Sequence, residues 1–148
     1  MRIAFLASQQ QLSGIAALTW VAKDNGELDR YEGKPAVPPN CVLVKVSITR
    51  TEDISDKRQK CWGNVIVRYW ADVTKSETSN KAPESALARS LAYYDTVDDI
   101  YTCLQGFYNV ELDTFSRTSQ AEEERRDGLV IMRFVFATSW IDLTAEEA

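Results

Sequence analysis

The sequence predicts an α+β domain in two layers, with an N-terminal helix and a central helix packed on a mainly antiparallel sheet of two long hairpins. Two observations support this fold class. Apolar residues recur every three or four positions over residues 83–106, which indicates an amphipathic helix. Apolar and polar residues alternate over residues 41–49, 61–73 and 129–141, which is typical of β-strands. The length of 148 residues fits one domain, residues 1–148.

The N-terminal region predicts one helix and one short strand. The helix is expected over residues 2–12 and the strand over residues 18–23, closed by an Asp-Asn-Gly turn at residues 24–26. Residues 27–40 are polar and contain three prolines but no Ser/Gly-rich run. We therefore expect an ordered arm there, not a flexible linker.

Residues 41–49 and 61–73 predict the first hairpin, in which the two strands run antiparallel. The charged segment between them, residues 50–60, is longer than a tight turn needs, so we expect a loop. A second polar loop, residues 74–82, leads into the central helix.

The central helix begins near Pro83, whose missing N–H has no partner in the first helical turn in any case. Gly106 is the expected left-handed stop. The buried stripe of this helix is expected to contain Leu87, Leu91, Tyr94, Val97, Tyr101 and Leu104, widened by Ala86, Ser90, Tyr93, Ile100 and Phe107.

Residues 110–118 and 129–141 predict the second hairpin, joined by a strongly charged loop over residues 119–128. The acidic tail, residues 142–148, is expected to be frayed. Both hairpins carry apolar residues on both faces, which a sheet with one face in water does not need. We therefore expect another element, such as a second subunit, to cover the second face.

Composition excludes several function classes. The net charge of −5 gives no support to nucleic-acid binding through a basic field. The chain has no histidine, which removes the commonest general base, the Ser-His and Cys-His nucleophile pairs and the commonest metal ligand. We expect no enzyme activity and no cofactor.

Three cysteines, Cys41, Cys61 and Cys103, lie far apart without a CxxC pair. We expect reduced, half-buried thiols in a cytoplasmic protein, with a metal or disulfide role as the alternative. The N-terminal apolar run is too short for a signal peptide, and no segment is long enough to span a bilayer.

Three charged groups are candidate sites. Asp95, Asp98 and Asp99 share one side of the central helix and form either a cation site or, as we favour, a solvated face. Glu122, Glu123 and Glu124 with Arg125 and Arg126 form either a metal or anion site or, as we favour, a mobile hairpin tip that keeps the chain soluble or meets a partner.

The third group is a local basic patch in the first hairpin loop, made of Arg50, Lys57, Arg58 and Lys60. Acidic residues in the same loop offset this patch, and it lacks the interleaved aromatic residues that favour nucleic acid. We therefore expect a solvated loop or a subunit contact.

The order of elements resembles the tail-terminator (tail-completion) proteins of long-tailed bacteriophages and prophages. The segments that carry the likeness are LTWVAKDNGEL, the arm KPAVPPNCVLVKV, the first hairpin, the central helix and the closing unit FSRTSQAEEERRDGLVIMRFVFATSW. Such proteins are small α+β domains with an N-terminal helix and two antiparallel hairpins separated by a helix.

The resemblance implies a ring, commonly of six subunits, that caps the tail tube and offers a docking surface to the neck. The partners it implies are the chain itself, a tail tube protein and a neck protein, with no membrane and no sequence-specific nucleic acid. It places the protein in the host bacterial cytoplasm during assembly and then in the virion tail. From charge and expected exposure, the candidate contacts are Arg50, Lys57, Arg58, Lys60, Arg117, Glu122, Glu123, Arg125 and Arg126.

Two alternatives belong to other classes. One is a small α+β ligand-binding or enzymatic domain, which should bring titratable groups together in a pocket. The other is an adaptor that binds a protein partner as a monomer or dimer without closing a ring.

Overall fold

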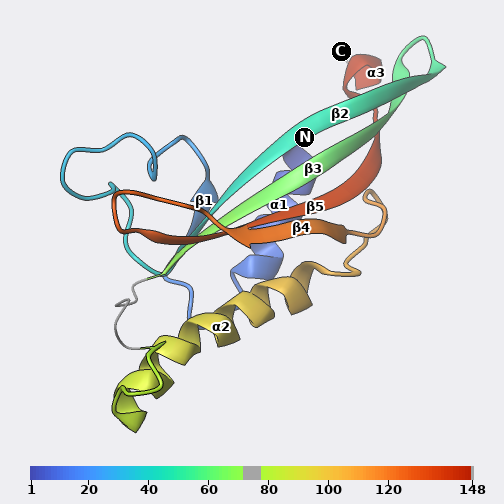
Figure 1. Ribbon diagram of the computed structural model, residues 1–148. Helices are drawn as coiled ribbons and strands as arrows, with labels where there is room; N and C mark the ends of the chain where they lie inside the picture. Colours follow the sequence, from blue (N-terminus) through green and yellow to red (C-terminus); the bar gives the residue numbers. More distant parts are fainter. Residues whose placement is uncertain (72–77, 148) are drawn as a thin grey trace.

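The computed structural model describes residues 1–71 and 78–147, in which three helices and five strands follow one another (Figure 1). In chain order they are α1 (Arg2–Leu12), β1 (Trp20–Lys23), β2 (Cys41–Ser55), β3 (Arg58–Ala71), α2 (Glu84–Leu104), β4 (Ser116–Glu122), β5 (Val130–Asp142) and α3 (Thr144–Glu147). The predicted α+β class, with two antiparallel hairpins on either side of a central helix, is confirmed.

The five strands form one sheet in the order β1-β2-β3-β5-β4. Strand β1 runs parallel to β2, whereas the other neighbours are antiparallel. The two hairpins join through β3 and β5, where Val67 lies opposite Phe134. This pairing brings the two halves of the chain into a single sheet.

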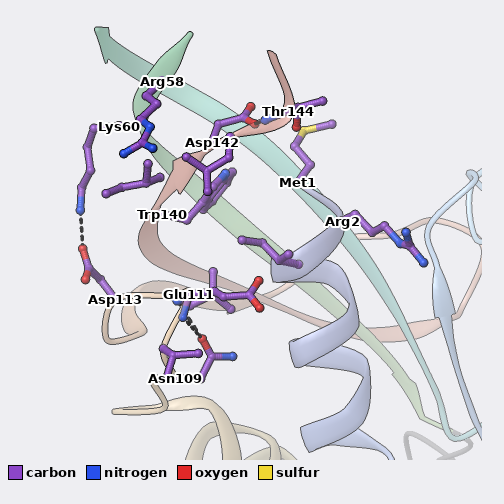
Figure 2. Close-up of a pocket in the computed structure, with 15 residues that line it drawn as sticks. Met1, Arg2, Arg58, Lys60, Asn109, Glu111, Asp113, Trp140, Asp142 and Thr144 are labelled. Carbon is purple, nitrogen blue, oxygen red and sulfur yellow. Dashed lines mark hydrogen bonds and ion pairs between the residues drawn. The ribbon is translucent and has the colours of Figure 1, made fainter. Parts of the chain in front are cut away.

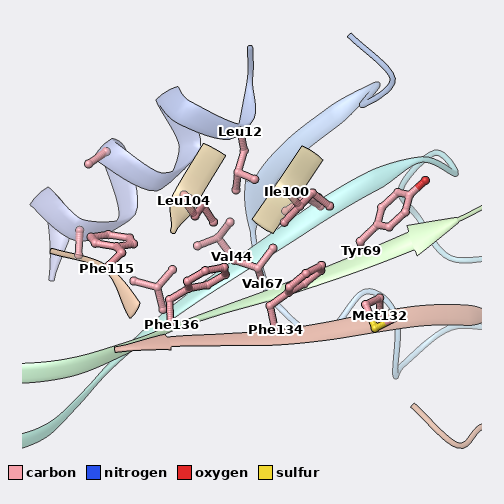
Figure 3. Packing of buried hydrophobic residues seen from close by; sticks show 14 of the residues in the cluster. Leu12, Val44, Val67, Tyr69, Ile100, Leu104, Phe115, Met132, Phe134 and Phe136 are labelled. Atoms are coloured by element: carbon pink, nitrogen blue, oxygen red, sulfur yellow. The ribbon is translucent and has the colours of Figure 1, made fainter. Parts of the chain in front are cut away.

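Both long helices cover the same face of the sheet. Side chains of three adjacent strands, among them Val44, Val67 and Phe134, meet Leu12 of α1 and Ile100 of α2 in the main core (Figure 3). Alternate residues of a strand face one side, so most alternate residues in the covered parts of β2, β3 and β5 belong to this core. The core therefore fills the space between helices and sheet.

The buried stripe of α2 differs from the predicted one. Leu91 and Tyr94 are 43% and 48% exposed. Tyr93 and Val97 face the sheet. Since an α-helix has 3.6 residues per turn, Leu91 and Tyr94 then fall on its outer side. The buried residues of α2 are Ser90, Tyr93, Thr96, Val97, Ile100 and Leu104. Gly106 has φ of +78°, so the predicted left-handed stop is confirmed.

The prediction of a loop at residues 50–60 is wrong, because most of these residues belong to the two strands. Strands β2 and β3 continue through it as a β-ribbon that ends in a two-residue turn between Ser55 and Arg58, which lie opposite each other. Bulges at Thr49 and Ile54 shift the register. The ribbon is exposed on both sides, so its sequence lacks the alternation that marks a half-buried strand. Val73 of the predicted strand lies outside the described residues, as do residues 74–77 of the next predicted loop.

The second hairpin begins later than predicted. Residues 110–115 are not a strand, because Asn109 Oδ1 accepts hydrogen bonds from the backbone N–H groups of Glu111 and Leu112 and forms a turn. Phe115 is fully buried next to this turn. Strand β4 begins only at Ser116 and extends to Glu122, so it includes the first residues of the predicted loop at 119–128. The predicted frayed tail contains the short helix α3.

The arm at residues 27–40 is ordered, as predicted, and it covers one end of the second face of the sheet. Leu28 and Val37 of the arm are buried against Cys41, Leu43 and Ile131 in a smaller second core. The cover that we expected from another subunit is therefore supplied at this end by the chain itself. Among the described residues, no helix is both long and apolar enough to cross a membrane.

Candidate interaction surfaces

The ribbon carries four of the predicted contact residues, and three of them already have partners within the chain. Arg50 stacks 4.1 Å from the centre of the Trp62 ring and pairs with Glu52 at 3.1 Å. Arg58 and Lys60 reach outward to other elements: the Arg58 guanidinium donates two hydrogen bonds to Glu146 of α3, at 2.7 and 2.9 Å, and Lys60 Nζ lies 2.6 Å from Asp113 Oδ2. Lys57 is exposed at the turn. The ribbon thus presents a mixed, partly paired surface.

Arg117 and Glu122 lie on β4 and contact α2. The Arg117 guanidinium lies 3.8 Å from the centre of the Tyr101 ring and donates a hydrogen bond to Gln120. Glu122 accepts a hydrogen bond of 2.8 Å from the Tyr93 hydroxyl. Burial, and then this carboxylate, raises the pKa of Tyr93 well above its usual value. These two residues therefore tie the edge of the sheet to the central helix.

Glu123 and Arg125 belong to an internal ion cluster, so the prediction of a mobile charged tip is wrong for them. The centre of the cluster is Arg68 of β3, which is 7% exposed. Its guanidinium donates paired hydrogen bonds to Asp29, at 2.8 and 2.9 Å, and to Glu123, both at 2.8 Å. Arg68 also lies 3.4 Å from Asp24. Arg126 is exposed.

Arg125 extends the ion cluster along the arm. It pairs with Asp29 at 3.1 Å and with Asp127 at 2.5 Å, and it donates to the backbone carbonyl of Leu28. Tyr31 donates a further hydrogen bond to Asp127. The cluster therefore fastens the arm to β3 and to the β4–β5 connection, which lie far from the arm in sequence.

The pKa values in the ion cluster follow from these contacts. Arg68 lowers the pKa of Asp29, against an opposing effect of burial, and Arg125 lowers the pKa of Asp127. Glu123 and Asp29 in turn raise the pKa of Arg68. All these shifts favour the charged forms, so Asp29, Asp127 and Arg68 stay ionised at neutral pH.

A second feature is a hollow of about 990 Å³ beside α3 and the start of α1 (Figure 2). Its wall includes Arg2, Glu111, Trp140 and Asp142, together with the Lys60–Asp113 pair. Trp140 is 2% exposed, and its indole N–H has no hydrogen-bond partner among the described residues. A buried donor of this kind is uncommon in proteins.

Two aspartates that line this hollow, Asp113 and Asp142, have lowered pKa values. Lys60, with a contribution from Ser139, lowers the pKa of Asp113, and Thr144 lowers the pKa of Asp142. A general acid that works near neutral pH needs a raised pKa instead.

The acidic residues Asp95, Asp98 and Asp99 are exposed on α2, as the favoured prediction of a solvated face requires. Among residues 1–71 and 78–147, no group of three or more His, Cys, Asp or Glu side chains is arranged so that it could hold a metal ion. Arg68, the centre of the ion cluster, was not among the predicted site residues. The sequence feature that could have indicated its role is a charged side chain within an otherwise apolar strand. Such a side chain is rarely buried unless it has charged or polar partners.

Comparison with known proteins gives no family assignment. No family model matches the chain. No curated protein matches its sequence.

Proposed function

We propose that this chain is a structural protein of the tail–neck junction of a bacteriophage or prophage. In that role it caps the tail tube and forms a docking ring for the head or neck. It acts in the host cytoplasm during assembly and then in the virion tail. The tube protein, the neck protein and further copies of the chain itself are its partners.

The observation that carries this proposal is the β2–β3 ribbon. It extends beyond the region where α1 and α2 cover the sheet (Figure 1). Most residues from Ile48 to Arg58 are exposed, and Ile54 is 55% exposed. Beyond Val44, the outer edge of β2 has no strand partner among the described residues. An open edge with exposed apolar side chains is suited to contact with another protein. The order of elements also agrees with the fold that the resemblance implies.

The test mixes the purified protein with tail tubes assembled from the tube protein of the same phage or prophage. We expect negative-stain images to show the protein as a ring at one end of each tube, and tube growth to stop when it is added. The charge-reversal variant Arg50→Glu/Lys57→Glu should cap fewer tubes than the wild type. Lys34→Glu/Lys81→Glu, which reverses two exposed charges away from the ribbon, is the matched control. Tubes that grow unaltered and stay uncapped would contradict the proposal.

The hollow beside Trp140 favours a second candidate function, that of a ligand-binding α+β domain. A ligand in this hollow would lie against Trp140 and beside the Lys60–Asp113 pair. Native mass spectrometry of the purified protein tests this candidate. A bound molecule that is lost in Trp140→Phe would support it, and an unliganded mass would count against it.

A further inference from the structure

Two surfaces on opposite sides of the fold are left without a partner in the described chain. The first is the outer face of α2, which consists of Glu84, Leu87, Leu91, Tyr94, Asp95 and Asp98. The second, here called the open sheet face, is the part of the second sheet face between the arm and the ribbon. Its residues are Lys45, Ser47, Asn64, Ile66, Arg133 and Ala137.

The outer face of α2 combines apolar and acidic side chains. Leu91 and Tyr94 are nearly half exposed, at 43% and 48%. Asp95 and Asp98 stand three residues apart on the same side of the helix, where like charges repel each other. Neither makes an ion pair with another described residue. A cationic partner would relieve this repulsion, and an apolar partner would cover the two large side chains.

The open sheet face has the complementary character. Lys45 and Arg133 are exposed and form no ion pair with a described residue. Arg133 lies directly opposite Arg68 on the neighbouring strand, an unfavourable arrangement of like charges. Lys45 lies opposite the half-buried Ile66.

The space beside these residues is a hollow of about 450 Å³, which Lys45, Ile66 and Arg133 line together with the ion cluster. The acidic residues of that hollow, Asp24, Asp29 and Glu123, are already engaged by Arg68 or Arg125. The two charged side chains of this face that form no ion pair with a described residue, Lys45 and Arg133, are therefore both cationic. The row beyond the hollow consists of the small residues Ser47, Asn64 and Ala137.

A single copy cannot join these two surfaces, because they point in opposite directions. The inner residues of α2, such as Val97, pack with Val44 and Val67 on the first face of the sheet. Residues of the open sheet face alternate with these and point the other way. A second copy in a head-to-tail arrangement can join them, since each copy offers one surface of each kind.

We infer that the outer face of α2 in one copy docks on the open sheet face of the next copy. Leu91 and Tyr94 then cover Ile66 and the small residues beside it, while Asp95 and Asp98 meet Lys45 and Arg133. The contact is heterologous, so it propagates from copy to copy and closes when the rotation between copies permits. The closure into a ring rests on the proposed tail–neck function, and the contact itself is tested on the isolated protein.

The test reverses charge on one surface at a time. The helix variant is Asp95→Lys/Asp98→Lys, and the sheet variant is Lys45→Glu/Arg133→Glu. By sedimentation velocity at low salt, we expect each variant alone to self-associate at least about tenfold more weakly than the wild type. An equimolar mixture should regain the association, because each reversed surface then meets its reversed counterpart and the two unaltered surfaces also pair.

The matched control pair carries the same charge changes elsewhere on the surface. Glu32→Lys/Glu124→Lys and Lys34→Glu/Arg126→Glu alter exposed residues outside both surfaces. These variants should associate as the wild type does, and their mixture should gain nothing. The inference is overturned if the wild type stays monomeric at about 1 mM, a concentration at which even an association with a Kd of about 1 mM is detected. It is also overturned if the mixture of helix and sheet variants stays dissociated.

A disulfide cross-link gives a second readout that does not depend on charge. The double variant Ile66→Cys/Tyr94→Cys is made, like the single variants, with Cys103→Ser, because Cys103 is only half-buried. It should form a ladder of linked oligomers under mild oxidation, since every copy then has one accessible thiol for each of its two neighbours. Neither single variant should form the ladder. Linked dimers from a single variant would indicate a symmetric contact and overturn the inference. If the ladder forms but tubes stay uncapped, the contact between copies is supported and the tail–neck function is contradicted. If tubes are capped but no ladder forms, the tail–neck function is supported and the contact is contradicted.

Discussion

The ring of Trp140 lies directly over the backbone of Gly63 on the neighbouring strand. A β carbon added at Gly63 would lie 2.7 Å from Cη2 of Trp140 and 2.6 Å from the backbone carbonyl oxygen of Ser47. Such distances are shorter than atoms tolerate, and the Ser47 contact involves backbone that cannot rotate away. Gly63 is thus required where three strands and the largest side chain of β5 meet.

We expect Gly63→Ala to lower the free energy of unfolding by about 2–3 kcal/mol, because the added methyl group displaces Trp140 or separates the strands. Urea denaturation followed by tryptophan fluorescence measures the change. Gly14→Ala is the matched control, since its new methyl group would lie 3.5 Å from the nearest atom, an ordinary contact. Equal stability of Gly63→Ala and the wild type would show that this packing is looser than described.

The sequence predicted the helices and the buried parts of the strands because burial leaves a periodic pattern. The pattern fails where burial is absent. The ribbon is solvated on both sides, so hydrogen bonding alone defines it and residues 50–60 resemble a loop. In α2, apolar residues surround much of the helix, and periodicity cannot decide whether Leu91 or Tyr93 faces the sheet. The protein fold decides this, because Tyr93 stacks against Tyr69 with ring centres 5.8 Å apart.

The ion cluster could not be predicted from sequence for a different reason. Its centre, Arg68, meets Asp29 and Glu123, which lie 39 and 55 residues away along the chain. Nothing in the local pattern around either acid indicates such a partner. Only the ordered arm and the β3–β5 pairing bring these groups together, so the tertiary fold creates the cluster.

We expect the thiols of the native protein to react slowly with N-ethylmaleimide. Burial raises the pKa of Cys41 and of Cys103 to about 11 and also raises the pKa of Cys61. At pH 8, a thiol of pKa 11 is ionised in only about one molecule in a thousand, and the thiolate is the reactive form. Mass spectrometry should show little labelling in buffer and three labels in guanidinium chloride.

Cys41 also reports on the arm, because it lies in the second core with Leu28. Leu28→Ala should loosen the arm and speed the labelling of Cys41 more than that of Cys61. Labelling of Cys41 in the wild type as fast as in free cysteine would contradict the buried position of this thiol.

Removing the centre of the ion cluster should destabilise the fold. Arg68→Met leaves Asp29 and Glu123 without their main partner, and we expect a loss of about 3 kcal/mol in the free energy of unfolding. Arg133→Met, at the opposite position on β5, is the matched control and should change stability by no more than about 0.5 kcal/mol, because Arg133 is exposed. Urea denaturation measures both variants. Similar losses of stability in the two variants would show that the ion pairs of Arg68 do not stabilise the fold.

Acid should weaken the attachment of the arm. Arg68 and Arg125 hold the pKa values of Asp29 and Asp127 below their usual value of 3.8. A carboxyl whose pKa is lower in the folded than in the unfolded protein stabilises the fold above the unfolded value, and this stabilisation is lost as the pH falls through the folded value. The free energy of unfolding should therefore decrease as the pH falls below about 4.

Asp127→Asn should be less stable than the wild type at pH 7 and should lose less stability on acidification. Asp95→Asn, an exposed change on α2, should keep the wild-type profile. Parallel profiles for Asp127→Asn and the wild type between pH 7 and acid would show that the Arg125–Asp127 pair does not contribute to stability.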